Sequence, residues 1–371
     1  MNLGVSEEHE ELRDSVRRFL ADRAPLARVR ELMETDDGLD RAVWDQAGQQ
    51  LGLQALAIPE AYGGAGFTFA EQAVVLEELG AALYTGPYLA SAVLAAAALL
   101  AVADEGARQD LLPPIASGET IATLAFAEDS GSWDLADIAT TAVKNGAGWR
   151  LDGHKSFVLD GTAAGLILVA AGTDAGLSLF AVDGSAAGLT RTVLPALDPT
   201  RKLGRLELAG VTGRLLGSPG DAAAALDRTL DIAAIALAAE QLGGAQRALD
   251  MAVDYAKIRQ QFGRPIGSFQ AIKHRCADLL LEVESLRPAV SYAAAAVTES
   301  PEEIPVLASL LKAQASETYF HAAAENIQIH GGIGFTWEHD AHLYFKRAKA
   351  SELFLGDASY HREHLATRIG L

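Results

Sequence analysis

The sequence is short of cysteine and of aromatic residues. Cys276 is its one cysteine, which excludes an intrachain disulfide and a cluster of thiolate metal ligands. Because this residue lies in an apolar-periodic stretch, we expect a packed thiol. Aromatic residues make up only 6% of the 371 residues, although hydrophobic residues make up 50%. The low bulk and the abundant alanine favour closely packed helices, since alanine has the highest helix propensity.

Positive charge and long hydrophobic runs are also scarce. Lys and Arg number 30 against 49 Asp and Glu, a formal net charge of -19, which disfavours nucleic acids and anionic membranes as partners. A few local arginines still suffice to hold a small anionic ligand. The apolar run 89–102 spans about 14 residues, whereas a membrane helix needs about 20. Segment 1–11 lacks the basic and apolar regions of a signal peptide, so we expect a cytoplasmic protein.

The pattern of hydrophobic residues divides the chain into three parts. Ser6 is a candidate N-cap for a first helix, and further helices are expected at 71–83 and 89–102. After a glycine-rich turn at 59–66 and the Pro113-Pro114 pair, short apolar runs alternate with glycine and aspartate turns about every 10 residues, as in an antiparallel β-domain. The pattern runs from Ile121 to about Gly217, with examples at 120–125, 149–151, 155–159, 166–171 and 177–182.

An alanine-rich helix from Asp221 to about Ile258 begins the last part, in which Pro288, Pro301 and Pro305 are expected to mark helix ends. The predicted fold is α+β and has three domains. These are a helical domain at 1–118, a β-domain at 119–219 and a helical bundle at 220–371.

Two motifs carry a resemblance to a known family. Residues 255–270 read YAKIRQQFGRPIGSFQ and residues 328–335 read QIHGGIGF. Together with the Pro-Glu…Gly-Gly turn at 59–64 and the three-part layout, they resemble the acyl-CoA dehydrogenase family over nearly the whole chain. The resemblance implies FAD as cofactor, an acyl-CoA thioester as substrate, a tetrameric assembly and an electron-transfer flavoprotein as electron acceptor.

In this family the two motifs reach across a subunit interface to the FAD of a neighbouring protomer. The resemblance therefore assigns cofactor contacts to residues that the chain would lend to a partner. A guanidinium can hold a pyrophosphate, and glycines let a backbone approach closely. The lent residues would be Arg259, Phe262, Gln270, Gln328, Gly331 and Gly332.

The half of the site that the chain would use itself departs from the family pattern. Ala127 stands where a threonine usually contacts the flavin, and Leu159 replaces a second threonine near flavin N5. Trp133 stands where a serine usually helps to hold coenzyme A. Phe157 keeps an aromatic wall for the flavin. These changes weaken the case for FAD bound in cis.

Leu355 occupies the position of the family's catalytic glutamate, which removes a proton from the α-carbon. In some relatives the base lies on the long helix, at a position near Ala233 or Ala234 here, and neither residue can act. Glu240, seven residues on, is a weak candidate base, as are Glu352 and Asp357 beside Leu355.

The favoured hypothesis is a subunit without its own base that completes the FAD site of a paralogous partner, as in actinobacterial heterotetramers for steroid or acyl side chains. The alternatives are a self-sufficient homotetramer using Glu240, a flavin-dependent monooxygenase on the same fold, and a structural protein without ligand.

Overall fold

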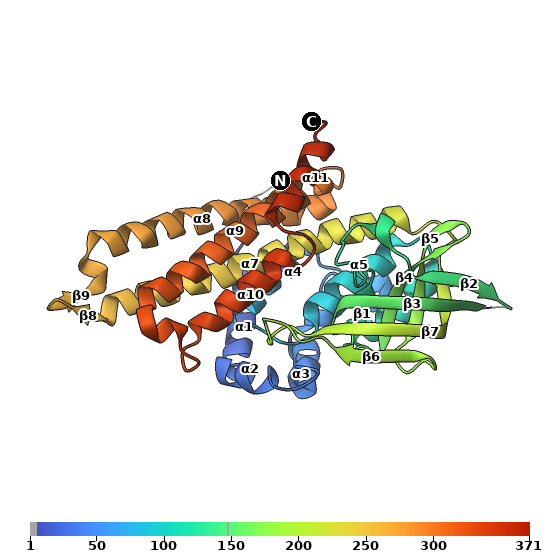
Figure 1. The fold of residues 1–371 in the computed structure, drawn as a ribbon, viewed down its shortest axis with the longest axis horizontal. Helices are drawn as coiled ribbons and strands as arrows, with labels where there is room; N and C mark the ends of the chain where they lie inside the picture. Colours follow the sequence, from blue (N-terminus) through green and yellow to red (C-terminus); the bar gives the residue numbers. More distant parts are fainter. Residues whose placement is uncertain (1–5, 147) are drawn as a thin grey trace. The chain divides into compact units, whose positions relative to one another are not determined.

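The computed structural model describes residues 6–146 and 148–371, so the first five residues of segment 1–11 lie outside the described residues. The chain divides into two compact units (Figure 1). The first unit combines residues 1–29, 69–84 and 234–371, and the second combines 30–68 and 85–233. No described helix combines the length and apolar character needed to cross a membrane.

Helices α1 (Glu7–Arg23), α4 (Phe69–Ala81) and most of α7 (Ala223–Ile258) build the first unit with the C-terminal helices. Ser6 caps α1 as predicted, because its side chain accepts a hydrogen bond from His9 N at 3.1 Å. The predicted end of α7 at Ile258 is correct. The C-terminal helices are α8 (Gln270–Glu299), α9 (Ile304–His330), α10 (Ala341–Leu353) and α11 (Ala358–Arg368).

Small residues let α4 and α7 pack with their backbones in contact. A Cβ atom added to Gly243 would lie 1.8 Å from the carbonyl oxygen of Glu77, and one added to Gly80 would lie 2.0 Å from that of Glu240. Neither position accepts a larger residue, which explains part of the bias toward small side chains. The expectation that Pro288 ends a helix is wrong, since this residue lies inside α8.

The second unit begins with short helices that the hydrophobic pattern did not predict. They are α3 (Arg41–Leu51), α6 (Glu105–Ala116) and the 3-10 turns η1 (Leu53–Ala55) and η2 (Glu60–Tyr62), while α2 (Leu26–Leu32) spans the division between the units. The apolar run at 89–102 forms a π-helix, η3 (Leu89–Ala95), followed by α5 (Ala96–Ala101). Pro113 and Pro114 lie inside α6.

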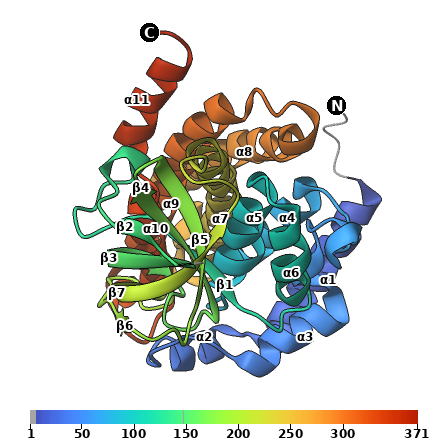
Figure 2. The same ribbon diagram turned by 90° about the vertical axis from the view of Figure 1, so that its right-hand side faces the viewer.

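The remainder of the second unit is a largely antiparallel sheet, in which β3, β7 and β6 lie side by side (Figure 2). In the described part of the chain its order is β1-β4-β2-β3-β7-β5, with β6 added on β7. The pair β1–β4 is parallel, which differs from the all-antiparallel expectation. The strands are β1 (Ala122–Ala125), β2 (Thr141–Asn145), β3 (Gly148–Leu159), β4 (Leu166–Thr173), β5 (Gly176–Asp183), β6 (Leu189–Val193) and β7 (Leu203–Leu216).

Candidate functional site

A two-residue turn holds Phe262 beyond the end of α7. Strands β8 (Gln260–Gln261) and β9 (Arg264–Pro265) pair through Gln261 and Arg264, so Phe262 and Gly263 form the turn. Both have positive φ, 52° and 76°, the backbone of a type I′ turn that favours Asn-Gly. Phenylalanine is strained in this conformation, yet its side chain is 92% exposed. A bulky apolar group held in water at a turn indicates a contact surface.

The ends of α7 and α9 support this hairpin. Ala252 and Ala256 of α7 form a small buried core with Ile329 of α9. The ring of Tyr255 stacks on that of His330, with centroids 4.2 Å apart. These contacts bring the two segments of the family resemblance together at the end of the first unit that carries β8 and β9 (Figure 1).

The polar members of the predicted set are exposed at this end. Arg259, Gln270 and Gln328 are exposed, and their side chains make no hydrogen bond or ion pair within residues 6–146 and 148–371. A Cβ atom on Gly331 or Gly332 would meet no atom within 4 Å, so the space before both glycines is open. Free donors beside open backbone fit a pyrophosphate group well. We call this set the hairpin surface: Arg259, Phe262, Gln270, Gln328, Gly331 and Gly332.

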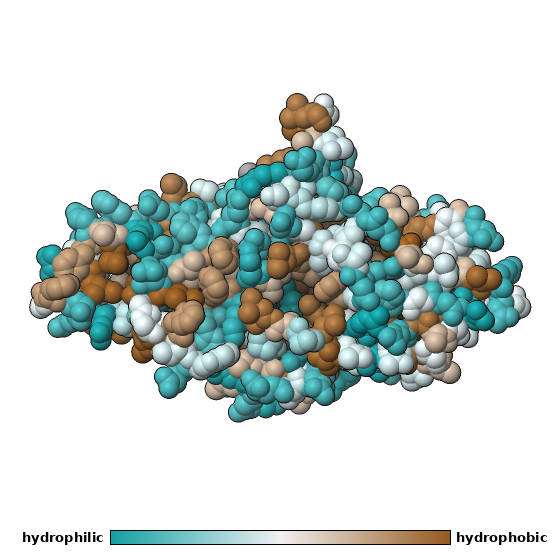
Figure 3. Space-filling model, in the orientation of Figure 1, coloured by the Kyte–Doolittle hydropathy of each residue, from teal (hydrophilic) through white to brown (hydrophobic). Residues whose placement is uncertain are grey.

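Further apolar side chains lie exposed on the same unit. Ile258 is 74%, Phe335 82% and Trp337 69% exposed, and Figure 3 shows hydrophobic surface at the end that carries β8 and β9. The ammonium of Lys346 lies 4.1 Å from the ring centroid of Trp337. Such an apolar surface is typical of a protein–protein contact.

Leu355 lies in a turn between α10 and α11 that is held by buried polar groups. Its φ is 62°, a left-handed conformation that is uncommon for leucine. Lys312 Nζ donates to the carbonyls of Glu352 at 3.0 Å and Gly356 at 2.8 Å. Burial and the nearby Lys312 charge lower the pKa of His361 to about 4, so its neutral ring donates from Nε2 to the carbonyl of Leu355 at 2.9 Å. The turn keeps a fixed shape without a carboxylate at position 355.

Sequence reasoning missed Lys312 and His361. Both donate hydrogen bonds to backbone carbonyls of the turn. Lys312 is 40 or more residues away from its acceptors in sequence, and the turn that His361 contacts is irregular, so no local motif marks either contact.

The carboxylates considered as replacement bases are all engaged. Glu240 Oε1 lies 2.9 Å from Nη1 of Arg347, and both side chains are buried. Glu352 pairs with Lys349 at 2.9 Å. Asp357 caps α11 by accepting a hydrogen bond from Tyr360 N. Each oxygen named here already has a donor, which makes it a poorer acceptor for a substrate proton.

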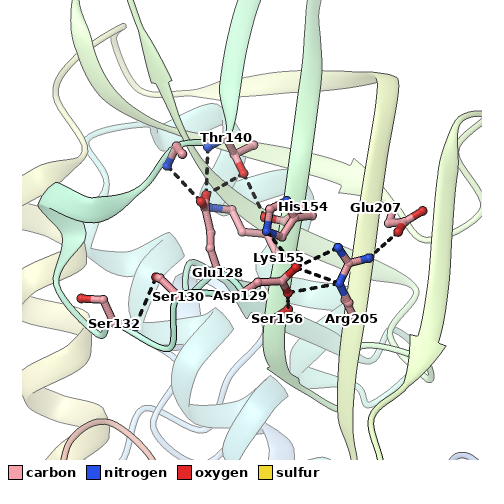
Figure 4. A network of polar contacts seen from close by, with 11 residues as sticks. Glu128, Asp129, Ser130, Ser132, Thr140, His154, Lys155, Ser156, Arg205 and Glu207 are labelled. Carbon is pink, nitrogen blue, oxygen red and sulfur yellow. Dashed lines mark hydrogen bonds and ion pairs between the residues drawn. The ribbon is translucent and has the colours of Figure 1, made fainter.

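Phe157, the remaining predicted cofactor contact, lies in the second unit at a bulge of β3. Its φ is 58°, so the bulge turns this ring out of the regular alternation of the strand. Beside it, Lys155 donates to Glu128 Oε1 at 2.8 Å in a network that fixes the end of the β1–β2 loop (Figure 4). Ala127 and Leu159 are buried near these residues in sequence and offer no side-chain donor.

A cavity of about 820 Å³ lies elsewhere in the first unit, between α1, α4, α7, α8 and α10. Three of its arginines are paired with carboxylates: Arg17 donates to Glu78 at 2.9 Å, Arg13 Nη1 lies 2.8 Å from Glu77 Oε2, and Arg287 also pairs with Glu77. None of the predicted site residues lines it. The ion pairs tie α1 to α4, and the cavity is separate from the hairpin surface.

Comparison with protein-family models agrees with this geometry. The N-terminal, middle and C-terminal domains of acyl-CoA dehydrogenases match residues 6–119, 123–210 and 223–370. The chain belongs to the acyl-CoA dehydrogenase family. It has the family's three-domain fold, helical at both ends with a β-domain between. The family consists of FAD-dependent oxidoreductases of lipid β-oxidation.

Several relatives are similar over almost the whole chain. Acyl-CoA dehydrogenase IpdE2 of Mycobacterium tuberculosis is 39% identical over 349 residues, covering 94% of this chain and 93% of that protein. The structure of a variant of the Tcur3481-Tcur3483 steroid ACAD has a TM-score of 0.89 and 35% identity, covering 99% and 98% of the two chains. The ChsE4-ChsE5 complex from Mycobacterium tuberculosis has a TM-score of 0.89 and 32% identity, covering 100% and 99%.

Proposed function

We propose that this chain is the base-lacking subunit of an FAD-dependent acyl-CoA dehydrogenase, and that its hairpin surface completes the FAD site of a paralogous partner. The assembled enzyme would convert an acyl-CoA thioester to the 2-enoyl-CoA and pass its electrons to an electron-transfer flavoprotein. The observation that carries the proposal is the contrast between Leu355, which cannot accept a proton, and the hairpin surface, whose polar side chains are free and exposed.

Each residue of the hairpin surface would make a different contact with the partner's cofactor. Arg259 would neutralise the pyrophosphate, and Gln328 would supply a donor and an acceptor. Gly331 and Gly332 would let the cofactor approach the backbone, and Phe262 would cover an apolar part of it. FAD, when bound, would accept the hydride from the β-carbon of the substrate. A carboxylate of the partner would have to act as the base that accepts the α-proton.

Two similar structures support a heteromeric assembly. One is the complex of ChsE4 with ChsE5, and the other, the Tcur3481-Tcur3483 steroid ACAD, is likewise named after two proteins. The residues in the two halves of the present chain's site point the same way. Its lending residues match the family motif, while its own flavin contacts have lost two hydroxyl groups at Ala127 and Leu159.

A self-sufficient enzyme with Glu240 as base is the weaker reading. The arginine at 2.9 Å stabilises the charged carboxylate and occupies one of its oxygens. A base in that ion pair would first have to separate from Arg347 before it could take a proton. The geometry therefore favours a structural role for Glu240.

The test is co-expression with a paralogous dehydrogenase that has the catalytic glutamate. We expect the chain alone to hold little FAD and to show no dehydrogenase activity, and the purified complex to hold FAD and oxidise acyl-CoA. Full FAD loading and activity of the chain by itself would refute the proposal. Mixing with a partner whose catalytic glutamate is changed to glutamine is the matched control, which should bind FAD and stay inactive.

A further inference from the structure

The loop between β1 and β2, residues 126–140, contains two positions that the family resemblance assigns to the chain's own site: Ala127 at a flavin contact and Trp133 at a coenzyme A contact. We propose that Trp133 fills the flavin side of this loop and excludes FAD from the chain's own β-domain. This inference rests on the proposed function. It names the side chain that prevents the chain's own half of the site from binding FAD, while the hairpin surface still contacts the FAD of the partner. All of the residues involved in this exclusion lie in the second unit.

The two ends of the loop are tied together by one buried carboxylate. Glu128 accepts hydrogen bonds from Ala139 N at 3.0 Å, Thr140 N at 2.9 Å and Thr140 Oγ1 at 2.7 Å. It also accepts one from Lys155 Nζ at 2.8 Å, which anchors the loop to β3 (Figure 4). A loop closed at both ends has few conformations open to it, so its middle is held in place.

The middle of the loop is braced by its own side chains. Ser132 Oγ donates to Asp137 Oδ2 at 2.6 Å and accepts from Asp134 N at 3.2 Å. Trp133 lies between Ser132 and Asp134, so these hydrogen bonds restrain the backbone that carries its indole.

The indole packs on two aromatic rings. Its centroid lies 5.9 Å from that of Phe126 and 6.2 Å from that of Phe157, with tilted planes. Phe157 is the ring that the resemblance assigns as the flavin wall, and the bulge of β3 fixes it at positive φ. An aromatic contact that the family would make with the cofactor is therefore made here by Trp133.

The polar groups beside this aromatic cluster are engaged as well. Asp129 is paired with Arg205 at 2.9 Å and His154 at 3.1 Å, and accepts a hydrogen bond from Ser156 (Figure 4). Hydrogen bonds from Arg205 and Ser156 lower the pKa of Asp129 to about 2, so it is ionised at neutral pH. The donors of Arg205, His154 and Ser156 are therefore occupied by Asp129. With the hydroxyls at positions 127 and 159 also absent, the residues present do not fit FAD.

The experiment uses the complex with the paralogous subunit and separates the indole from the lost hydroxyls. One variant restores the hydroxyls but keeps Trp133: Ala127→Thr with Leu159→Thr. A second adds Trp133→Ser, and a third adds Trp133→Phe, which keeps an aromatic ring at this position. FAD per complex is measured after gel filtration, and FAD affinity by fluorescence titration.

We expect only the variant with Trp133→Ser to bind additional FAD, with affinity at least about tenfold above that of the variant that keeps Trp133. The variant with Trp133→Phe should behave like the one with tryptophan. Each complex carries an internal control, because the partner's FAD depends on the hairpin surface and should be retained in all three.

Additional FAD already bound with Trp133 in place would overturn the inference. So would a folded complex with Trp133→Ser that retains the partner's FAD and gains none. These outcomes leave the proposed function intact. FAD bound in full by the unchanged chain alone would overturn both this inference and the proposed function.

Discussion

Glu240 of α7 and Arg347 of α10, 107 residues apart, form a buried ion pair with Oε1 and Nη1 separated by 2.9 Å. Removing one partner of such a pair leaves an uncompensated buried charge and costs about 3–5 kcal/mol. We expect Glu240→Gln to lower the free energy of unfolding by an amount of this order. The FAD content and the activity per flavin of the complex should stay unchanged, which thermal unfolding and a dehydrogenase assay on one preparation would measure.

The double variant Glu240→Leu with Arg347→Met is the control, since apolar residues of similar volume often replace a buried pair without loss. It should recover most of the stability. A Glu240→Gln protein of normal stability without activity would mean that Glu240 is the base after all.

Arg259 should contribute to FAD binding only in the assembled enzyme. A hydrogen bond to a charged group contributes about 1.5–3 kcal/mol, so Arg259→Ala should weaken FAD binding by the complex about 10- to 100-fold. Lys257→Ala is the matched control, because this exposed residue lies two positions away and its nearest carboxylate, Asp254, is 3.7 Å away. Equal losses in the two variants would indicate a general charge effect and count against a pyrophosphate contact.

Phe262 should show opposite effects on stability and on cofactor binding. Asparagine suits the first position of a type I′ turn, so Phe262→Asn should stabilise the chain alone by about 1 kcal/mol. The same change removes the apolar contact and should speed FAD release from the complex. Thermal unfolding of the chain and the FAD dissociation rate of the complex measure the two effects. Slower FAD release would contradict the assigned role of the ring.

Acid should destabilise the β-domain through Glu128. Burial alone would raise the pKa of this carboxyl, but hydrogen bonds from Lys155 and Thr140 outweigh burial and lower it from 4.5 to about 2. A folded-state pKa below the unfolded value contributes stability above pH 4.5 and loses it as the pH falls toward 2. Urea unfolding across this range should show that loss, and Glu128→Gln should make the profile flatter. Parallel profiles for the two proteins would exclude this carboxyl as the cause.

The long elements and the hairpin surface could be predicted from the sequence. The helix ending at Ile258 follows from sustained alanine-rich periodicity, and the residues of the hairpin surface lie in one contiguous motif and one short one. The π-helix at 89–95 could not be predicted, because composition does not distinguish hydrogen bonds to the fifth residue from those to the fourth. Strand β7 lies within the predicted β-domain, but its glycines interrupt the alternation of apolar residues and obscure its bounds.

Tertiary contacts set the limits of the prediction at the site. The position of Leu355 was readable by alignment with the family motif, but its left-handed backbone and its anchors, Lys312 and His361, depend on helices that meet only in the fold. The ion pair of Glu240 could not be predicted for the same reason. Its partner, Arg347, lies 107 residues away in sequence, so the sequence alone does not show that the carboxylate is already paired.

The exposed ring of Phe262 also sets a condition on how the chain is produced in the cell. A copy without a partner leaves a strained aromatic tip in water beside other apolar side chains, which favours self-association and capture by chaperones. Under the proposed function, synthesis in amounts matched to the partner would avoid that surplus. The hairpin would then link the abundance of this chain to the abundance of its proposed partner.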